Sequence, residues 1–159
     1  MSVDMTEEQI KVTDKMRALC SRREYCSSDI FAKVVKALDG DKEASRTVVD
    51  RLISEKYIDD SRYAAAFVRD KSSISGWGET KIRYMLSAKG IARDVISQAL
   101  NETDPDKASS RLEKLMVRKA AALKDDPQRR LKLLRYGLGR GYLYEEVSSV
   151  VDRIEKQQW

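Results

Sequence analysis

The sequence contains no histidine and only two cysteines, Cys20 and Cys26. Without histidine, the Ser-His and Cys-His pairs that activate many enzymatic nucleophiles are excluded. Two thiols alone do not complete the usual four-ligand zinc site of cysteines and histidines. The cysteines are not in a C-x-x-C motif, so we expect idle or buried thiols, with a redox pair as the alternative. We therefore expect no catalytic residue, no metal and no cofactor, and predict that the protein is not an enzyme.

Residues that interrupt helices are also scarce. The 159 residues include two prolines and seven glycines, aromatic residues make up 7%, and charged residues make up 36%. This composition is typical of helices with wide solvated faces and argues against a β-sandwich or barrel. No apolar run approaches the roughly 18 residues of a membrane-spanning helix. The acidic start, MSVDMTEEQIK, differs from a secretory signal, so we expect a cytoplasmic protein with no membrane partner.

The charges are arranged in blocks. Residues 1–61 carry a net charge of −2, residues 62–93 of +5, residues 94–106 of −4 and residues 107–140 of +8. Two basic blocks separated by an acidic segment favour a polyanion or an acidic protein surface as partner. The alternative is that the lysines and arginines simply solvate exposed helix faces.

The most distinctive segment is DDSRYAAAFVRDK, residues 59–71. Adjacent aspartates resemble a catalytic carboxylate pair, but neighbouring residues on a helix point about 100° apart and do not converge on one bond. We therefore predict that Asp59 or Asp60 caps a helix. Tyr63 and Phe67 then face a core, and Arg62 and Arg69 face outward.

Apolar residues recur with helical spacing through the rest of the chain, and local signals predict where several helices start. The motif Thr6-Glu7-Glu8-Gln9 is a capping box. We expect Ser27 or Ser28 to cap a second helix and residues 101–106 to form a linker before a helix at about 107–123. We expect Asp126 and Pro127 to begin another helix, whose buried stripe is predicted to be Leu131, Leu134 and Leu138.

Three glycines mark an internal repeat. Shifting the chain by 51 residues aligns the segment around Gly90 with that around Gly141, and Gly40 lies 50 residues before Gly90. We therefore predict an all-α fold of three tandem three-helix repeats that form an elongated, curved body. The expected divisions are an N-terminal helical extension (1–14), repeat 1 (15–58), repeat 2 (59–104) and repeat 3 (105–159).

The order and spacing of these motifs resemble the RecX family of regulators of the RecA recombinase. The resemblance covers roughly residues 15–155 and rests on YIDDSRYAAAFVRDK (57–71), the following G-x-x-x-I-x-x-x-L-x-x-K-G-I (78–91), ALCSRREYCSSDI (18–30) and the late Arg140-Gly141-Tyr142. Asp39, Trp77 and Gly137 depart from the family pattern. The resemblance implies a protein that lodges in the groove of the RecA–DNA filament and usually limits its activity.

Basic residues on the expected outer faces are the candidate contacts for the recombinase or for single- or double-stranded DNA. They are Arg22, Arg23, Arg62, Arg69, Lys71, Lys81, Arg83, Lys89, Arg129, Arg130, Arg135 and Arg140. Each could instead be a solvated charge or a local ion pair. A second hypothesis is a helical DNA- or RNA-binding protein that acts without a recombinase, including by reading the major groove through a helix–turn–helix. The sequence leaves open whether regulation is inhibitory or stimulatory.

Overall fold

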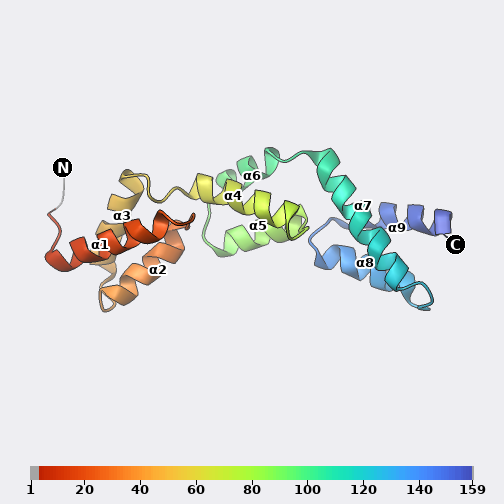
Figure 1. Ribbon diagram of the computed structural model, residues 1–159, viewed down its shortest axis with the longest axis horizontal. Helices are drawn as coiled ribbons and strands as arrows, with labels where there is room; N and C mark the ends of the chain where they lie inside the picture. The colour runs from red at the N-terminus through yellow and green to blue at the C-terminus, as the bar shows by residue number, and fades with distance from the viewer. Residues whose placement is uncertain (1–3, 159) are drawn as a thin grey trace.

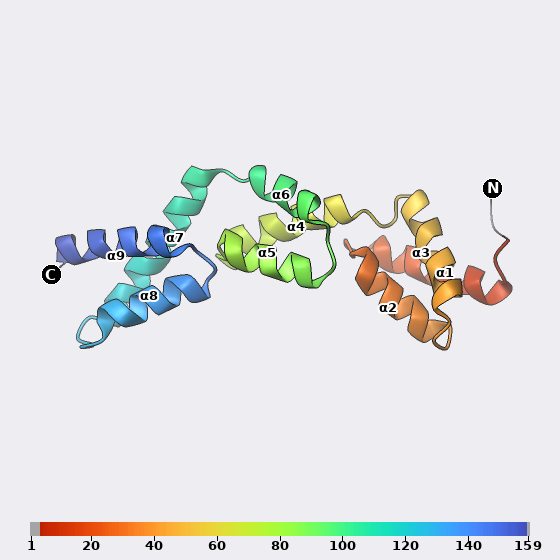
Figure 2. The same ribbon diagram turned by 180° about the vertical axis from the view of Figure 1, so that it is seen from behind.

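The chain folds into a row of three helical units (Figure 1). The computed structural model describes residues 4–158, and within that range it has nine helices and no strand. The helices are α1 (Glu7–Cys20), α2 (Ser27–Ala37), α3 (Lys42–Ser54), α4 (Asp60–Ser73), α5 (Glu79–Ala88), α6 (Arg93–Asn101), α7 (Pro105–Ala122), α8 (Arg129–Gly139) and α9 (Tyr144–Gln158). The two ends of the chain lie at opposite ends of the row, and the reverse view shows the same order of units (Figure 2). The predicted all-α, three-repeat architecture is confirmed.

Each unit has its own hydrophobic core. Ile30, Val48 and Leu52 are among the buried residues of the first core, Ile82 and Leu86 of the second. The third core packs α7, α8 and α9 together through residues that include Leu112, Met116, Leu133 and Val147. Apart from Cys26 of the first unit, which is buried in the second core, each core is built within one unit. Most of the burial that stabilises the fold is therefore local to a repeat, as in other repeat proteins.

The glycine turns that predicted the repeat occur at the same place in each unit. Gly40, Gly90 and Gly141 connect the second helix to the third, with φ angles of 85°, 77° and 97°. Positive φ is strained for residues with a Cβ atom but not for glycine. The helix α1 crosses residue 14 and places Val12 and Met16 in the first core. The expected extension 1–14 therefore shares a helix with the repeat that follows it.

Local capping explains several helix starts. Thr6 and Gln9 form the predicted capping box of α1. Asp59 is the N-cap of α4, and its carboxylate accepts the backbone N–H of Arg62 at 3.1 Å. This confirms the capping interpretation of the aspartate pair. The helix α7 begins at Pro105 with Asp104 as its cap, two residues before the predicted start, because proline suits the first helical position.

The start of α2 is determined by a contact across repeats, and the prediction of a serine cap is wrong. The N-cap is Cys26, which makes no side-chain capping bond. Instead, Ser27 donates its backbone N–H and its hydroxyl to the carboxylate of Asp60, at 2.8 and 2.7 Å. The second aspartate of the pair therefore holds repeat 1 to repeat 2. Its negative charge also interacts favourably with the positive end of the α2 dipole.

Two predictions for α8 are wrong. The helix starts at Arg129, because Asp126 accepts the N–H of Gln128 in a turn that precedes the helix. Leu133 and Gly137 face the core and Leu134 packs partly against it, while Leu131 and Leu138 are exposed. A Cβ atom on Gly137 would lie 2.5 Å from a side-chain carbon of Val147. The close approach of α9 at this glycine sets which face of α8 is buried.

Candidate interaction surface

Repeats 2 and 3 meet through their backbones. The N–H of Gly78, at the start of α5, donates to the carbonyl of Arg140 at 2.7 Å, and the N–H of Thr80 donates to the carbonyl of Gly141 at 3.0 Å. A Cβ atom on Gly78 would lie 2.5 Å from the carbonyl carbon and oxygen of Gly141. The contact therefore requires glycine at position 78. The hydroxyl of Tyr142 adds a bond to the carbonyl of Gly76 at 3.2 Å.

A cluster of cations and aromatic rings surrounds this joint. The ammonium of Lys71 lies 4.8 Å from the ring centroid of Trp77, and that of Lys81 lies 4.4 Å from it. We call this arrangement the tryptophan clamp. Phe67 supports Trp77 in an edge-to-face contact, with ring centroids 6.2 Å apart. Cations over an indole ring are attracted by the negative face of its π-system.

Arg140 lies at the same joint, beside a second aromatic ring. Its guanidinium donates to the carbonyl of Ser75 and lies 5.9 Å from the ring centroid of Tyr136, which Lys119 approaches at 5.3 Å. We define the joint patch as Lys71, Trp77, Lys81, Lys119, Tyr136 and Arg140. Within residues 4–158, none of its four cations forms an ion pair with a carboxylate. The joint patch is therefore an unneutralised positive surface.

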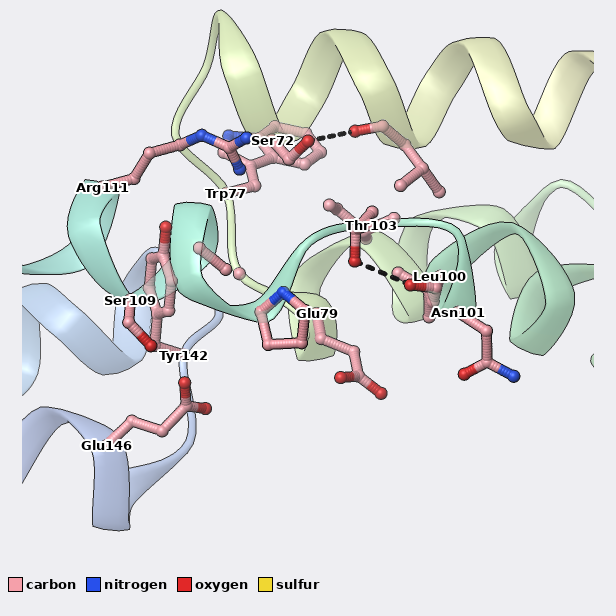
Figure 3. Close-up of a pocket in the computed structure, with 15 residues that line it drawn as sticks. Ser72, Trp77, Glu79, Leu100, Asn101, Thr103, Ser109, Arg111, Tyr142 and Glu146 are labelled. Atoms are coloured by element: carbon pink, nitrogen blue, oxygen red, sulfur yellow. Dashed lines mark hydrogen bonds between the residues drawn. The ribbon is translucent and has the colours of Figure 1, made fainter.

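A cleft of about 310 Å³, the joint cleft, lies between the same two repeats (Figure 3). Its lining includes Trp77, Tyr142, Arg111, Glu79 and Glu146. Figure 3 shows Trp77 and Arg111 at one side of the cleft and the two glutamates at the other. Burial raises the pKa of the Tyr142 hydroxyl, which donates to the carbonyl of Gly76. The cleft thus has a cationic, aromatic side and an acidic side.

Most other predicted contact residues in repeats 2 and 3 are paired with acids. These pairs are Arg62 with Glu24 (2.8 Å), Arg69 with Asp70 (3.7 Å), Arg83 with Glu79 (3.1 Å), Lys89 with Asp29 (2.9 Å) and Arg130 with Asp152 and Glu155 (3.0 and 2.8 Å). Exposed pairs of this kind contribute about 1 kcal/mol or less to stability. They do reduce the positive charge available to an incoming anion.

Two of these pairs also connect repeat 1 to repeat 2. The guanidinium of Arg62 donates to the carbonyls of Lys56 and Tyr57 as well as to Glu24, which fixes the segment between α3 and α4. Lys89 reaches Asp29 on α2, beside the hydrogen bond from the Ser28 hydroxyl to the Lys89 carbonyl. The joint between repeats 1 and 2 therefore depends on side chains, whereas that between repeats 2 and 3 combines side-chain bonds with direct backbone–backbone hydrogen bonds.

The remaining candidates occupy three kinds of position. Arg129 is buried and donates to the carbonyl of Ala120 at 2.9 Å, which holds α8 against α7. Arg22 and Arg135 are exposed. Arg23 is exposed with its guanidinium 4.3 Å from the ring centroid of Tyr25. The structure brings Lys71, Lys81 and Arg140 to the joint between repeats 2 and 3.

The sequence interpretation missed Trp77, Lys119, Tyr136 and Arg111 as parts of this surface. Trp77 had a local signal, because two lysines flank it at six and four residues. Lys119 and Tyr136 had none, because the packing of α7 on α8 brings them together. Only the folded joint shows that these side chains form one surface.

The cysteines have no place in this surface. Cys26 is buried in the second core and its Sγ lies 3.4 Å from the hydroxyl oxygen of Ser28. Burial raises the pKa of both the Cys20 and the Cys26 thiols. Thiols with a raised pKa are poor nucleophiles at neutral pH.

Within the described residues, no helix is long and apolar enough to cross a membrane.

The fold and this surface define a class: an all-helical tandem-repeat protein with an extended face and a cationic joint. Comparison with known proteins identifies the family. Residues 59–100 match the family profile described as RecX, second three-helix domain. Regulatory protein RecX of Pectobacterium atrosepticum is 30% identical over 144 residues, which cover 89% of this chain and 85% of that protein. The chain belongs to the RecX family.

Two further comparisons agree with this assignment. A crystal structure of a regulatory protein RecX superposes with a TM-score of 0.82 at 26% identity, covering 92% of this chain and 72% of that one. Regulatory protein RecX of Clostridium tetani is 30% identical over 118 residues, or 72% of this chain. The matched region spans about half (54%) of the length of that relative. The family therefore includes proteins longer than this chain.

Proposed function

We propose that the protein is a non-enzymatic regulator that binds the RecA recombinase on DNA and lies in the groove of the filament. It lowers ATP hydrolysis, filament extension and strand exchange. Membership of the RecX family supports the partner. The observation that carries the mode of binding is the row of three repeats in Figure 1, because an extended body can contact successive protomers of a filament. A partner that acts on chromosomal DNA places the protein in the cytoplasm.

The cations that have no acidic partner within residues 4–158 are the proposed contacts of highest priority. They are Lys71, Lys81 and Arg140 at the joint between repeats 2 and 3, together with the exposed Arg22, Arg23 and Arg135. A cation that is not already neutralised attracts an anion more strongly and steers its approach over a longer range. Arg62, Arg69, Arg83, Lys89 and Arg130 are proposed contacts only if their present ion pairs exchange on binding.

The alternative function, direct nucleic-acid binding without a recombinase, is favoured by the same unneutralised surface. The two functions differ in their dependence on the partner and on salt. Binding dominated by phosphate contacts weakens steeply as the salt concentration rises. It is also equally strong with or without the recombinase.

The test adds the protein to recombinase filaments on single-stranded DNA and measures ATP hydrolysis and strand exchange. We expect both rates to fall as the protein is added, at concentrations that leave naked DNA largely unbound. A Lys71→Glu, Lys81→Glu variant should inhibit less, while Lys36→Glu, an exposed change of the same charge on α2, should inhibit like the wild type. Tight binding to naked DNA with no effect on either rate at any stoichiometry would establish the alternative function.

A further inference from the structure

We propose that the tryptophan clamp binds single-stranded nucleic acid, with a base stacked on Trp77 and the adjacent phosphates contacting Lys71 and Lys81. The inference rests on the proposed function in one respect: a filament regulator meets a nucleic-acid strand where it enters the groove. Its chemical basis is independent of the recombinase and lies in the arrangement of the ring and the two ammonium groups.

The first support is the electrostatic state of the lysines. Both ammonium groups lie over an indole ring, and in the described part of the chain neither meets a carboxylate. A lysine side chain is long and flexible, so its ammonium can leave the ring when a stronger anion arrives. A phosphate is such an anion, and its arrival uncovers the face of the indole. The lysines thus hold the ring in the absence of ligand and contact the backbone in its presence.

The second support is the position of the ring. Trp77 is half-buried, and Phe67 holds it through an edge-to-face contact. It precedes Gly78, whose N–H is fixed by the carbonyl of Arg140. A ring on a fixed backbone loses little conformational freedom when a base stacks on it. Proteins that bind single strands combine such rings with a cationic path, and stacking tolerates every base because each has a π-face.

The third support is the polarity of the joint cleft. Trp77 lines it on the same side as Arg111, and Glu79 and Glu146 line the opposite side in Figure 3. The carboxylate of Glu146 repels phosphates, and that of Glu79 repels them less because it is paired with Arg83. Arg111, Lys71 and Lys81 attract phosphates. A strand that crosses the joint is therefore directed along the side of the cleft that carries Trp77.

These features favour a single strand over the other polyanions. In a duplex the base faces are already stacked on each other, so Trp77 would have no face to contact. An acidic protein surface would neutralise the lysines but would gain nothing specific from the indole ring. A single strand uses both the charge and the ring.

The experiment uses the full chain with Trp159→Phe, which leaves Trp77 as the only tryptophan. Its fluorescence is followed during titration with an oligo-dT at several salt concentrations. We expect quenching on binding, and competition by duplex of equal length to be weaker. Lys71→Ala and Lys81→Ala should each lower the slope of log K against log salt by about 0.7. Trp77→Leu, followed by anisotropy of a labelled oligonucleotide, should weaken binding about tenfold or more.

Controls separate this inference from the proposed function. Lys36→Ala removes an exposed charge from α2 and should leave the salt slope unchanged. Trp77→Phe keeps an aromatic face and should retain most of the affinity.

If Lys71→Ala, Lys81→Ala and Trp77→Leu all bind the oligonucleotide like the wild type, the inference is wrong, whether or not the wild type slows recombinase ATP hydrolysis. If they lose affinity only for DNA-free recombinase, the clamp is a protein contact and the inference is again wrong. If Trp77 is quenched and the clamp variants bind more weakly, but ATP hydrolysis is unaffected, the inference stands and the proposed function fails.

Discussion

Replacing Gly78 by alanine should open the joint between repeats 2 and 3. The backbone at Gly78 has φ −84° and ψ 171°, a conformation that any residue adopts, so the substitution introduces no local strain. The new Cβ atom would lie 2.5 Å from the carbonyl carbon and oxygen of Gly141 and 2.6 Å from the nitrogen of Tyr142. These are backbone atoms that cannot rotate away, so the two repeats must separate.

The size of the effect follows from the contacts that separation breaks. The hydrogen bonds from the Gly78 and Thr80 amides, at 2.7 and 3.0 Å, are lost together with the bond from the Tyr142 hydroxyl to Gly76. At about 1 kcal/mol for each bond, the joint should lose about 2–4 kcal/mol. For a chain of this length, a loss of 1 kcal/mol in the free energy of unfolding lowers Tm by about 2–4 °C. The expected fall in Tm is therefore about 5–15 °C.

Thermal unfolding measures the loss, and amide hydrogen exchange locates it. In the wild type the Thr80 amide should be protected by the Gly141 carbonyl, and in Gly78→Ala it should exchange much faster. Gly139→Ala is the matched control, because nothing lies within 4 Å of its Cβ position and alanine favours the helix. A Gly78→Ala variant as stable as Gly139→Ala, with Thr80 still protected, would refute this account of the joint.

Two other substitutions test separate parts of the fold. Leu133→Ala should destabilise by about 2–5 kcal/mol in urea denaturation because Leu133 is fully buried, whereas Leu131→Ala should change stability by under about 1 kcal/mol; equal losses would contradict the observed face of α8. Burial disfavours the ionised form of Asp29, but hydrogen bonds, chiefly from Lys89, outweigh it and hold the pKa of Asp29 below its ordinary value. The contribution of the ionised Asp29 carboxylate to the free energy of unfolding is therefore present above about pH 4. It is lost as the pH falls through the lowered pKa of Asp29. The stability difference between the wild type and Asp29→Asn should shrink over that range, and a constant difference from pH 7 to pH 2.5 would contradict the role of this pair.

Local signals in the sequence predicted most of the helices and the repeat. The capping box at Thr6 and the cap formed by Asp59 act within four residues, so they were recognised without tertiary structure. Glycines at equivalent turns predicted the three units because a positive φ angle strongly favours glycine.

The errors arose where a contact distant in sequence determines the local structure. Leucines at 131, 133, 134 and 138 fit two faces of α8 equally well. The contact of Gly137 with Val147 selects between those faces. Asp59 caps its own helix as one of the two predicted candidates, but the contact of the Asp60 carboxylate with Ser27, 33 residues away at the start of α2, was not predicted. No periodic pattern in the sequence predicts either of these two contacts.

The interaction surface was predictable only in part. Lys71, Lys81 and Arg140 were identified from the basic blocks of the sequence. These blocks show where positive charges lie along the chain but not which of them are paired with carboxylates in the fold. Whether a lysine or arginine is paired depends on the fold: the guanidinium of Arg83 reaches Glu79, while the ammonium of Lys81, on the same helix, reaches Trp77. The joint patch is thus a property of the packed repeats.

The central claim is that the protein acts by lying along an assembled recombinase filament. Electron cryomicroscopy of filaments formed with single-stranded DNA and a non-hydrolysable ATP analogue, with and without the protein, tests it most directly. The account predicts added helical density in the filament groove, contacting more than one protomer, with the joint between repeats 2 and 3 facing the DNA. Filaments saturated with the protein that show no groove density, or density only at their ends, would contradict it.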